Sequence, residues 1–365
     1  MAAYPIELCP AANRISDQAR DALLVDPAFG RVFTEHMITI QYVHGSGWGA
    51  GKLVPHGPLQ LDPAASVLHY GQAIFEGFKA FRQPDGGIAT FRPDANAKRF
   101  QSSARRLAMP EPPIDLFIGA ADTLIAHERA WVPSGRGRSL YLRPLLIATE
   151  PALGVRPANE YLFLLLGSPA GNYFKGGVRP VTVWICEDYV RAAPGGTGAA
   201  KAAGNYAASL PAQAQAMQEG CDQVVWLDAV TRHNVEEMGG MNIFFVYQDG
   251  SRTTLVTPKL TGSLLPGITR DSLLTLGKEL GYAVEERTIS IDDWLSHASS
   301  GKMTEAFACG TAAVITPIGA LKNAKGVYPI RDGSMGPVSA RLREHLMDIQ
   351  YGNIADKYGW MHRIV

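Results

Sequence analysis

The chain has 365 residues and a mass of 39.4 kDa, which predicts two domains because a single core rarely keeps growing at this length. With 46% hydrophobic and 19% charged residues, the composition is that of a compact globular protein, which excludes a disordered chain. Lys and Arg (34) balance Asp and Glu (34), so the charge gives no reason to expect a nucleic-acid or membrane partner and favours small-molecule ligands.

The first half of the chain is predicted to mix strands and helices. Residues 37–43 and 88–92 are predicted strands, and a helix carrying Arg99 is predicted to begin at Asp94 and to run to about Leu107. Residues 140–149 are rich in β-formers. Their period of two places Tyr141 and Arg143 on one face of a strand and Leu142 on the other.

A stretch rich in Gly, Pro and aromatic residues around 170–180 predicts a connection between two parts. We therefore expect a small domain at 1–169, an interdomain loop at 170–182 and a larger domain at 183–365. In the second half, the predicted strands are 181–186, 223–227, 243–246 and 254–256, with a helix near 207–219. Another helix follows Pro266, and the free N–H groups at its start suit an anion such as phosphate.

Residues 194–201 (PGGTGAAK) form a glycine-rich loop that ends on a lysine. A nucleotide-binding Walker loop is excluded because Ala200 and Ala202 stand where Gly and Ser or Thr are needed. A dinucleotide fingerprint is excluded because Lys201 replaces the third glycine. A lone lysine in such a loop is more often a solvated surface charge, so the function of Lys201 depends on the motifs around it.

Six segments occur in order along the chain: YGQAIFEG (70–77), LYLRP (140–144), KAAGNY (201–206), EEMGGMN (236–242), LPG (265–267) and GTA (310–312). Together they resemble the branched-chain aminotransferases of bacterial type, which belong to fold type IV of the pyridoxal-phosphate enzymes. The resemblance extends from about Phe29 to Trp360. It implies an α+β fold with a small N-terminal α/β domain and a larger C-terminal domain built on a β-barrel-like sheet. It also implies that pyridoxal 5'-phosphate binds in the interdomain cleft.

The resemblance implies a cofactor site in which Lys201 is the catalytic residue that carries pyridoxal phosphate and moves the α-proton. Glu237 corresponds to the family carboxylate at the pyridine nitrogen. Neighbouring strand residues face opposite ways, so Glu236 is expected to face the surface. The resemblance also implies that Tyr206 forms a hydrogen bond to the phenolic oxygen of the cofactor. The phosphate would be bound by the Arg99 guanidinium, by the backbone N–H groups of Ile268 and Thr269 and by the Thr311 hydroxyl.

The implied substrates are leucine, isoleucine or valine on one side and glutamate or 2-oxoglutarate on the other. The resemblance gives the apolar walls of the substrate pocket to four aromatic residues: Phe29, Tyr70, Phe75 and Tyr141. Arg143 would pair with the distal carboxylate of glutamate. The turn that contains Thr311 and Ala312 would hold the α-carboxylate, with Tyr70 assisting.

The family further implies reversible ping-pong transamination by a homodimer. Residues 1–20 lack the apolar core of a signal peptide, no apolar run is long enough to span a membrane, and the cysteines show no metal-binding spacing. We therefore expect a cytoplasmic protein with four free thiols and no metal.

The chain departs from some relatives at two places. A CxxC redox pair found in animal members is absent after the GTA turn, and Gly240 stands where some members have Thr. Tyr173, Phe174 and Lys175 are expected to close over substrate. The remaining alternatives are a D-amino-acid aminotransferase, a 4-aminobenzoate-forming lyase, a protein that binds pyridoxal phosphate or an amino acid without turnover, and a scaffold. The 70–77 and 140–144 segments argue against the first two.

Overall fold

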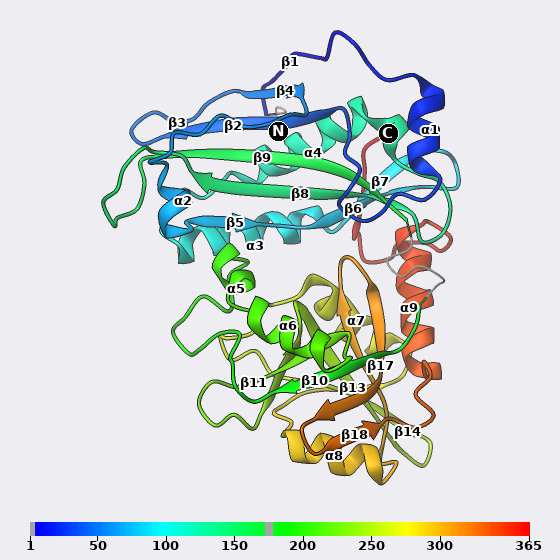
Figure 1. Ribbon diagram of the computed structural model, residues 1–365. Helices are drawn as coiled ribbons and strands as arrows, with labels where there is room; N and C mark the ends of the chain where they lie inside the picture. Colours follow the sequence, from blue (N-terminus) through cyan, green and yellow to red (C-terminus); the bar gives the residue numbers. More distant parts are fainter. Residues whose placement is uncertain (1–3, 172–177) are drawn as a thin grey trace. The chain divides into compact units, whose positions relative to one another are not determined.

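A computed structural model of the protein describes residues 4–171 and 178–365 (Figure 1). The hypothesis that Tyr173, Phe174 and Lys175 close over substrate concerns residues outside these ranges. The described chain forms two compact units. The first contains the N-terminal part through β9 together with Ala200–Ala203 and Asp348–Val365, and the second contains Gly204–Met347 and the residues that lead up to Ala199.

The first unit is built on a sheet of ten strands among the described residues, ordered β1-β4-β2-β9-β8-β6-β7-β19 with β3 paired to β2 and β5 to β8. Neighbouring strands are antiparallel except for the parallel pair β1 and β4. The strands are β1 (Ile6–Leu8), β2 (His36–Val43), β3 (Gly47–Trp48), β4 (Gly51–Pro55), β5 (Ala73–Phe75), β6 (Phe78–Arg82), β7 (Ile88–Phe91), β8 (Ser139–Ala148), β9 (Glu160–Ala170) and β19 (Met361–Arg363).

Two helices, α3 (Pro93–Arg106) and α4 (Ile114–His127), pack against one face of this sheet, and the main core of the unit lies between them and the strands (Figure 1). The helices are α1 (Asp17–Leu24), α2 (Ser66–Tyr70), α3 (Pro93–Arg106), α4 (Ile114–His127) and a 3₁₀ turn, η1 (Arg129–Trp131). Phe100 of α3 and Phe117 of α4 pack with Leu140 and Leu142 of β8. Since side chains alternate along a strand, Tyr141 and Arg143 lie on the other face of the sheet, as their spacing predicts.

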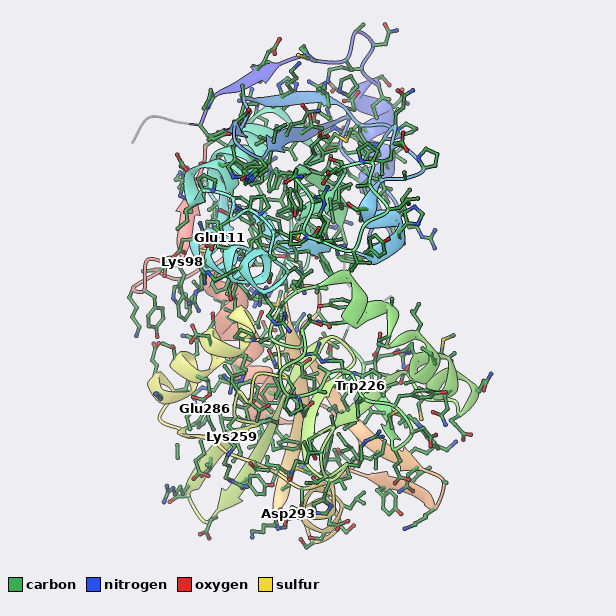
Figure 2. All side chains as sticks on the ribbon, turned by 90° about the vertical axis from the view of Figure 1, so that its left-hand side faces the viewer. Lys98, Glu111, Trp226, Lys259, Glu286 and Asp293 are labelled. Atoms are coloured by element: carbon green, nitrogen blue, oxygen red, sulfur yellow. The ribbon has the colours of Figure 1, made fainter. Side chains whose placement is uncertain are left out.

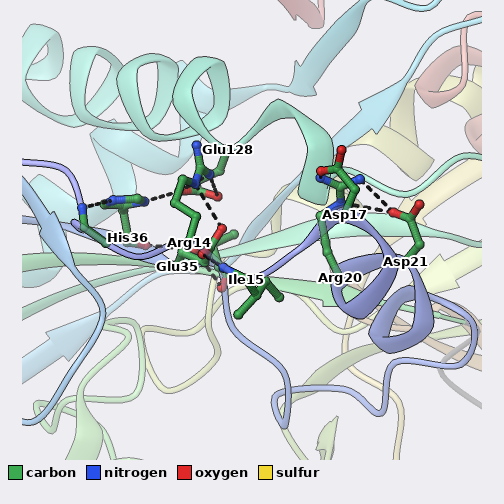
Figure 3. A network of polar contacts seen from close by, with 11 residues as sticks. Arg14, Ile15, Asp17, Arg20, Asp21, Glu35, His36 and Glu128 are labelled. Atoms are coloured by element: carbon green, nitrogen blue, oxygen red, sulfur yellow. Dashed lines mark hydrogen bonds and ion pairs between the residues drawn. The ribbon is translucent and has the colours of Figure 1, made fainter.

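The N-terminal segment is fixed to the first unit by a charged network (Figure 3). The Arg14 guanidinium bonds to Glu35 at 3.1 Å and to the buried Glu128 at 3.2 Å. The backbone N–H of Ile15 donates to Glu35 at 2.8 Å. His36 contacts Glu128 through Nδ1, and its Nε2 accepts a hydrogen bond from the N–H of Ala11. These bonds anchor the segment that leads into α1.

The second unit contains a closed barrel of six strands within the described residues, in the order β12-β11-β10-β17-β16-β13, closed by pairing of β12 with β13. Strands β14 and β15 extend it beyond β13, and β18 pairs with β17. The strands are β10 (Val181–Cys186), β11 (Gln223–Leu227), β12 (Val235–Met238), β13 (Met241–Asp249), β14 (Arg252–Thr257), β15 (Ala283–Glu286), β16 (Met303–Gly310), β17 (Val314–Asn323) and β18 (Gly326–Pro329).

Helices pack around this sheet and help to bury its strands. They are α5 (Ala203–Ala207), α6 (Leu210–Gln218), α7 (Ile268–Glu279), α8 (Ile291–Ser299) and α9 (Pro337–Gln350). Trp226 of β11, labelled in Figure 2, packs with Ala212 and Ala216 of α6. Trp294 of α8 joins the core formed by Phe245 and its neighbours in the barrel.

The predicted elements agree with the structure in type. The strand predicted at 37–43 is β2, that at 140–149 is β8, and those at 181–186 and 223–227 are β10 and β11. The helix predicted near 207–219 is α6, which begins at Leu210 because Pro211 suits a helix N-terminus rather than an interior. The four cysteines are free thiols. No helix in the described residues is long and apolar enough to cross a membrane.

Candidate active site

Lys201 lies within the first unit, against the edge of the sheet that carries β5. Its backbone N–H donates to the Ser103 hydroxyl of α3 at 2.9 Å, and its carbonyl accepts from the N–H of Phe75 at 3.1 Å. An antiparallel bridge between Ile74 and Ala202 continues this pairing. The Lys201 ammonium lies 4.8 Å from the centre of the Phe75 ring, so the backbone fixes the lysine beside an aromatic face.

Arg99, on α3, forms a two-pronged ion pair with a carboxylate of the YGQAIFEG motif. Its Nε and Nη2 lie 2.7 and 2.8 Å from the two oxygens of Glu76, which is completely buried. The N–H of Gly77 also donates to Glu76 at 3.1 Å. A guanidinium held in this way has a fixed direction, which suits the recognition of an anion.

Phe29, Phe75, Tyr141 and Arg143 lie together in the first unit. The Arg143 guanidinium is 4.8 Å from the Phe75 ring centre and donates to the Tyr141 hydroxyl at 3.1 Å. Phe29 packs edge-on against Tyr141 with ring centres 4.9 Å apart. Gly77 is required next to Tyr141, because a Cβ at that position would collide with the tyrosine hydroxyl. The group combines an apolar wall with one fixed cation.

Tyr70 has different surroundings from the other three aromatic residues. It ends α2, is 43% exposed, and its hydroxyl donates to the carbonyl of Leu153. Its ring lies near that of His69, with centres 6.1 Å apart. Tyr70 is therefore a partly exposed aromatic residue tied to the loop that contains Leu153.

Glu237 is a buried carboxylate of the second unit, held from three sides. It is 2% exposed and lies 2.8 Å from the Nε of Arg191. The Asn242 side-chain amide and the N–H of Leu265 donate to its Oε1 at 3.1 and 2.8 Å. These donors and the cation favour the charged form of a carboxylate that burial alone would penalise.

Glu236 does not face the surface, so that expectation was wrong. It is 5% exposed, and its carboxylate accepts from the Ser263 hydroxyl. The reason is a register shift between β11 and β12: Trp226 pairs with Glu237 but Leu227 pairs with Val235, so Glu236 is the extra residue of a β-bulge. A bulge interrupts the alternation of side chains on which the expectation depended.

Four further predicted residues lie at the ends of second-unit elements. Ile268 and Thr269 begin α7, whose N-cap, Gly267, supplies no side-chain cap to the first N–H groups. Thr311 and Ala312 form the turn from β16 to β17. That turn ends at Val314 with φ of 64°, a left-handed conformation that β-branched residues rarely adopt and that is found at sites where the backbone geometry matters.

Tyr206, in α5, lies next to Gly240. A Cβ at Gly240 would come within 3.3 Å of the Tyr206 ring, so the glycine lets the tyrosine approach the β12–β13 turn closely. Tyr206 also follows Asn205, whose amide bonds to the hydroxyl and carbonyl of Thr197. The bonds between Asn205 and Thr197 connect α5 to the PGGTG loop.

Sequence reasoning missed three residues that hold the predicted ones in place: Glu76, Arg191 and Asn242. Glu76 and Asn242 belong to the motifs at 70–77 and 236–242, so the motifs contained a signal for them. Arg191 gave a weaker signal as a lone cation shortly before the PGGTG loop. Its Nη2 donates to the carbonyls of Gly198 and Ser263 at 3.0 and 2.8 Å, which only the folded chain brings together.

Comparison with known proteins agrees with the family resemblance of the sequence motifs. Residues 73–321 match the model of the amino-transferase class IV family. The branched-chain-amino-acid aminotransferase of Mycolicibacterium smegmatis is 58% identical over 363 residues, which are 99% of each chain. The crystal structure of the Escherichia coli branched-chain amino acid aminotransferase superposes with a TM-score of 0.75 at 28% identity, covering 91% of this chain and all of that one.

A second solved structure was determined with a ligand. It is the branched-chain amino acid aminotransferase of the organism abbreviated T.th., complexed with N-(5'-phosphopyridoxyl)-L-glutamate, with a TM-score of 0.73 at 28% identity, covering 92% of this chain and all of that one. The family match, the identity and the fold agree with the ordered motifs of the sequence. The chain therefore belongs to the class IV aminotransferases, among the branched-chain-amino-acid aminotransferases.

Proposed function

We propose that this protein is a pyridoxal-phosphate-dependent transferase that moves the amino group reversibly between leucine, isoleucine or valine and 2-oxoglutarate, by a ping-pong mechanism. The observation that carries the proposal is full-length similarity, at 58% identity, to a branched-chain-amino-acid aminotransferase. The ligand of the T.th. structure unites a phosphopyridoxyl group with glutamate, which supports both the cofactor and the second substrate.

The residues of this chain fit the cofactor chemically. Glu237 is a buried acceptor that contacts Arg191, Asn242 and the N–H of Leu265, which suits a protonated pyridine nitrogen. The start of α7 offers N–H groups without a side-chain cap, which suits a phosphate dianion. When bound, pyridoxal phosphate supplies an aldehyde that accepts the amino group and a ring that delocalises the electron pair left at the α-carbon.

Each predicted residue has a defined part in this proposal. Lys201 attaches the cofactor and moves the proton between the substrate α-carbon and the cofactor. Glu237 holds the proton on the ring nitrogen, and Tyr206 donates to the phenolic oxygen. Arg99, the N–H groups of Ile268 and Thr269, and the Thr311 hydroxyl bind the phosphate.

Substrate choice is assigned to the aromatic group and its cation. Phe29, Phe75 and Tyr141 contact aliphatic side chains, and Arg143 pairs with the distal carboxylate of glutamate or 2-oxoglutarate. The turn with Thr311 and Ala312 binds the α-carboxylate, assisted by Tyr70.

The test is a spectrum of the protein supplied with pyridoxal phosphate, recorded before and after L-leucine and again after 2-oxoglutarate. We expect leucine to bleach the visible cofactor band and 2-oxoglutarate to restore it, and we expect the Lys201→Ala variant to do neither. A band that ignores leucine but responds to D-alanine would overturn the specificity. A protein that stays colourless would overturn the enzymatic assignment.

The proposal also includes a cytoplasmic homodimer, as the family resemblance implies. Sedimentation equilibrium on the protein loaded with cofactor tests the oligomer, for which we expect about twice the chain mass of 39.4 kDa. A species with the mass of a single chain would contradict it.

A further inference from the structure

The second unit contains a cavity of about 270 Å³ that the proposed reaction does not use. It is bounded by the loop after β11, by β12 and by the loop that follows β14. None of the residues that line it in the described structure belongs to the predicted cofactor or substrate set. Its size is near the lower limit of small-molecule sites, which restricts an occupant to a few heavy atoms.

Glu236 is the main chemical feature of the cavity. It lines the cavity at 5% exposure, and the Ser263 hydroxyl donates to one of its oxygens. The other oxygen, Oε2, is buried and has no hydrogen-bond partner among the described residues. A buried carboxylate oxygen without a donor is costly and has capacity for one. The β-bulge at Glu236 places this group here rather than on the surface.

The other acidic residue of the cavity is already occupied. The carboxylate of Asp228 accepts from the N–H groups of Thr231, His233 and Asn234 and from the Thr231 hydroxyl, at 2.7 to 3.1 Å. These bonds fix the loop after β11. Arg270 fixes the opposite loop by donating to the Pro258 carbonyl at 2.9 Å. The walls are therefore built before any ligand binds, and Glu236 is the acidic group left to receive one.

Lys259 lies on the exposed rim of the same cavity, at the surface of the second unit (Figure 2). No carboxylate of the described chain lies within ion-pair distance of its ammonium. Val230, Val235 and Leu264 supply apolar wall. A buried acid, an exposed cation and an aliphatic surface match the ammonium, carboxylate and side chain of a zwitterion.

We propose that this cavity is a second binding site, separate from the predicted active site, for a free α-amino acid with a small aliphatic side chain. The ligand ammonium binds Glu236, its carboxylate binds Lys259, and its side chain contacts Val230 and Leu264. The inference does not depend on the proposed transamination. Burial raises the pKa of Glu236, against the hydrogen bonds of Ser263 and Thr261 and the charge of Arg191, so binding of an ammonium tightens as pH rises through that pKa.

Isothermal titration calorimetry with L-valine tests the site. Holoenzyme treated with borohydride is used, so that Lys201 is blocked and valine cannot react. We expect saturable binding to the wild type, at least about tenfold weaker binding to Glu236→Gln, and about two- to fivefold weaker binding to Lys259→Gln, whose side chain is exposed. Lys278→Gln, an exposed lysine of α7 that does not line the cavity, is the matched control and should bind like the wild type.

Isobutylamine separates the two ends of the ligand. It should lose affinity for Glu236→Gln and keep it for Lys259→Gln, because it lacks the carboxylate. Equal binding of valine by all variants would place that binding elsewhere, for example in the active site, and would overturn the inference. No saturable binding to the wild type would show that the cavity holds water only. If the protein failed the leucine spectrum, the untreated protein without cofactor would be titrated with valine in place of the reduced holoenzyme, so the two proposals fail separately.

Discussion

At the scale of the residue, Arg143 is the side chain to which we assign dual specificity. Its guanidinium stacks on Phe75 and bonds to Tyr141, which fixes a cation next to an apolar wall. We expect Arg143→Ala to lower kcat/KM for glutamate and 2-oxoglutarate by about tenfold or more, since a charge-assisted hydrogen bond is lost, and to change it far less for leucine. Steady-state kinetics with both substrates measure the ratio. Equal losses would show that Arg143 has a structural function only.

Arg191 is expected to contribute more to stability than an exposed arginine does, because it is the cation next to a buried acid. Replacement by Met leaves the Glu237 carboxylate buried without its ion-pair partner and releases the carbonyls of Gly198 and Ser263. We expect Arg191→Met to lower the free energy of unfolding by about 3 to 5 kcal/mol.

Chemical denaturation of the Arg191→Met variant and of the wild type measures this loss. The control is Arg179→Met, which removes an exposed pair with Asp222 and should cost less than about 1 kcal/mol. If both variants unfolded at the same denaturant concentration, the buried pair would contribute no more than a surface pair.

At the scale of the element, the segment that precedes α1 depends on the charge of Glu35. Burial alone would raise the pKa of Glu35, but the N–H of Ile15 and the Arg14 guanidinium outweigh it and hold the pKa below its ordinary value. A carboxyl whose pKa is lowered in the folded protein contributes its full stabilisation at pH above its ordinary pKa, about 4.3. That contribution is lost as pH falls through the lower pKa of the folded state.

We therefore expect the segment around Ile15 to detach in acid before the sheet unfolds. The protection factor of the Ile15 amide against hydrogen exchange should fall below about pH 4, the range of a titrating carboxyl. In Glu35→Gln the protection factor of this amide should be low at neutral pH and should not change in acid. Protection that persists in Glu35→Gln would show that Glu128 and His36 hold the segment without Glu35.

At the scale of the whole molecule, the end of the chain returns to complete the sheet of the first unit. Strand β19 pairs with β7, the N–H of Ile88 donates to Val365 at 2.8 Å, and that of Ile364 donates to Ile88 at 2.9 Å. His362 also contacts Asp122 of α4 at 2.9 Å. Removing residues 361–365 should therefore destabilise the first unit by about 2 to 4 kcal/mol, from several lost hydrogen bonds.

Thermal unfolding of the truncated chain measures this effect. His362→Gln, which removes only the half-exposed contact with Asp122, should cost less than about 1 kcal/mol. A truncated chain with the melting temperature of the intact protein would show that β19 is dispensable. The domain boundaries expected at 1–169, 170–182 and 183–365 stay a prediction. Residues 200–203 and 348–365 group with the first unit by their contacts, although they are far from it in sequence.

The sequence by itself determined the family, the α+β fold class and the elements with strong periodicity, such as β2, β8 and β11. It could do so because motifs and hydrophobic periods are local: the residues that carry them are neighbours along the chain. Tyr141 and Arg143 share a face for this reason alone. The predicted site residues came from the motifs, and their functions stay predictions until the experiments above are done.

Only the tertiary structure decided which groups hold those residues. Arg99 meets Glu76, Glu237 meets Arg191, and Lys201 pairs with Phe75 through contacts between residues at least 23 positions apart, which no local pattern specifies. Glu236 shows the limit most clearly. Strand alternation placed it on the surface, but the bulge that buries it arises from pairing with β11, so its environment depends on a neighbouring strand and not on its own sequence.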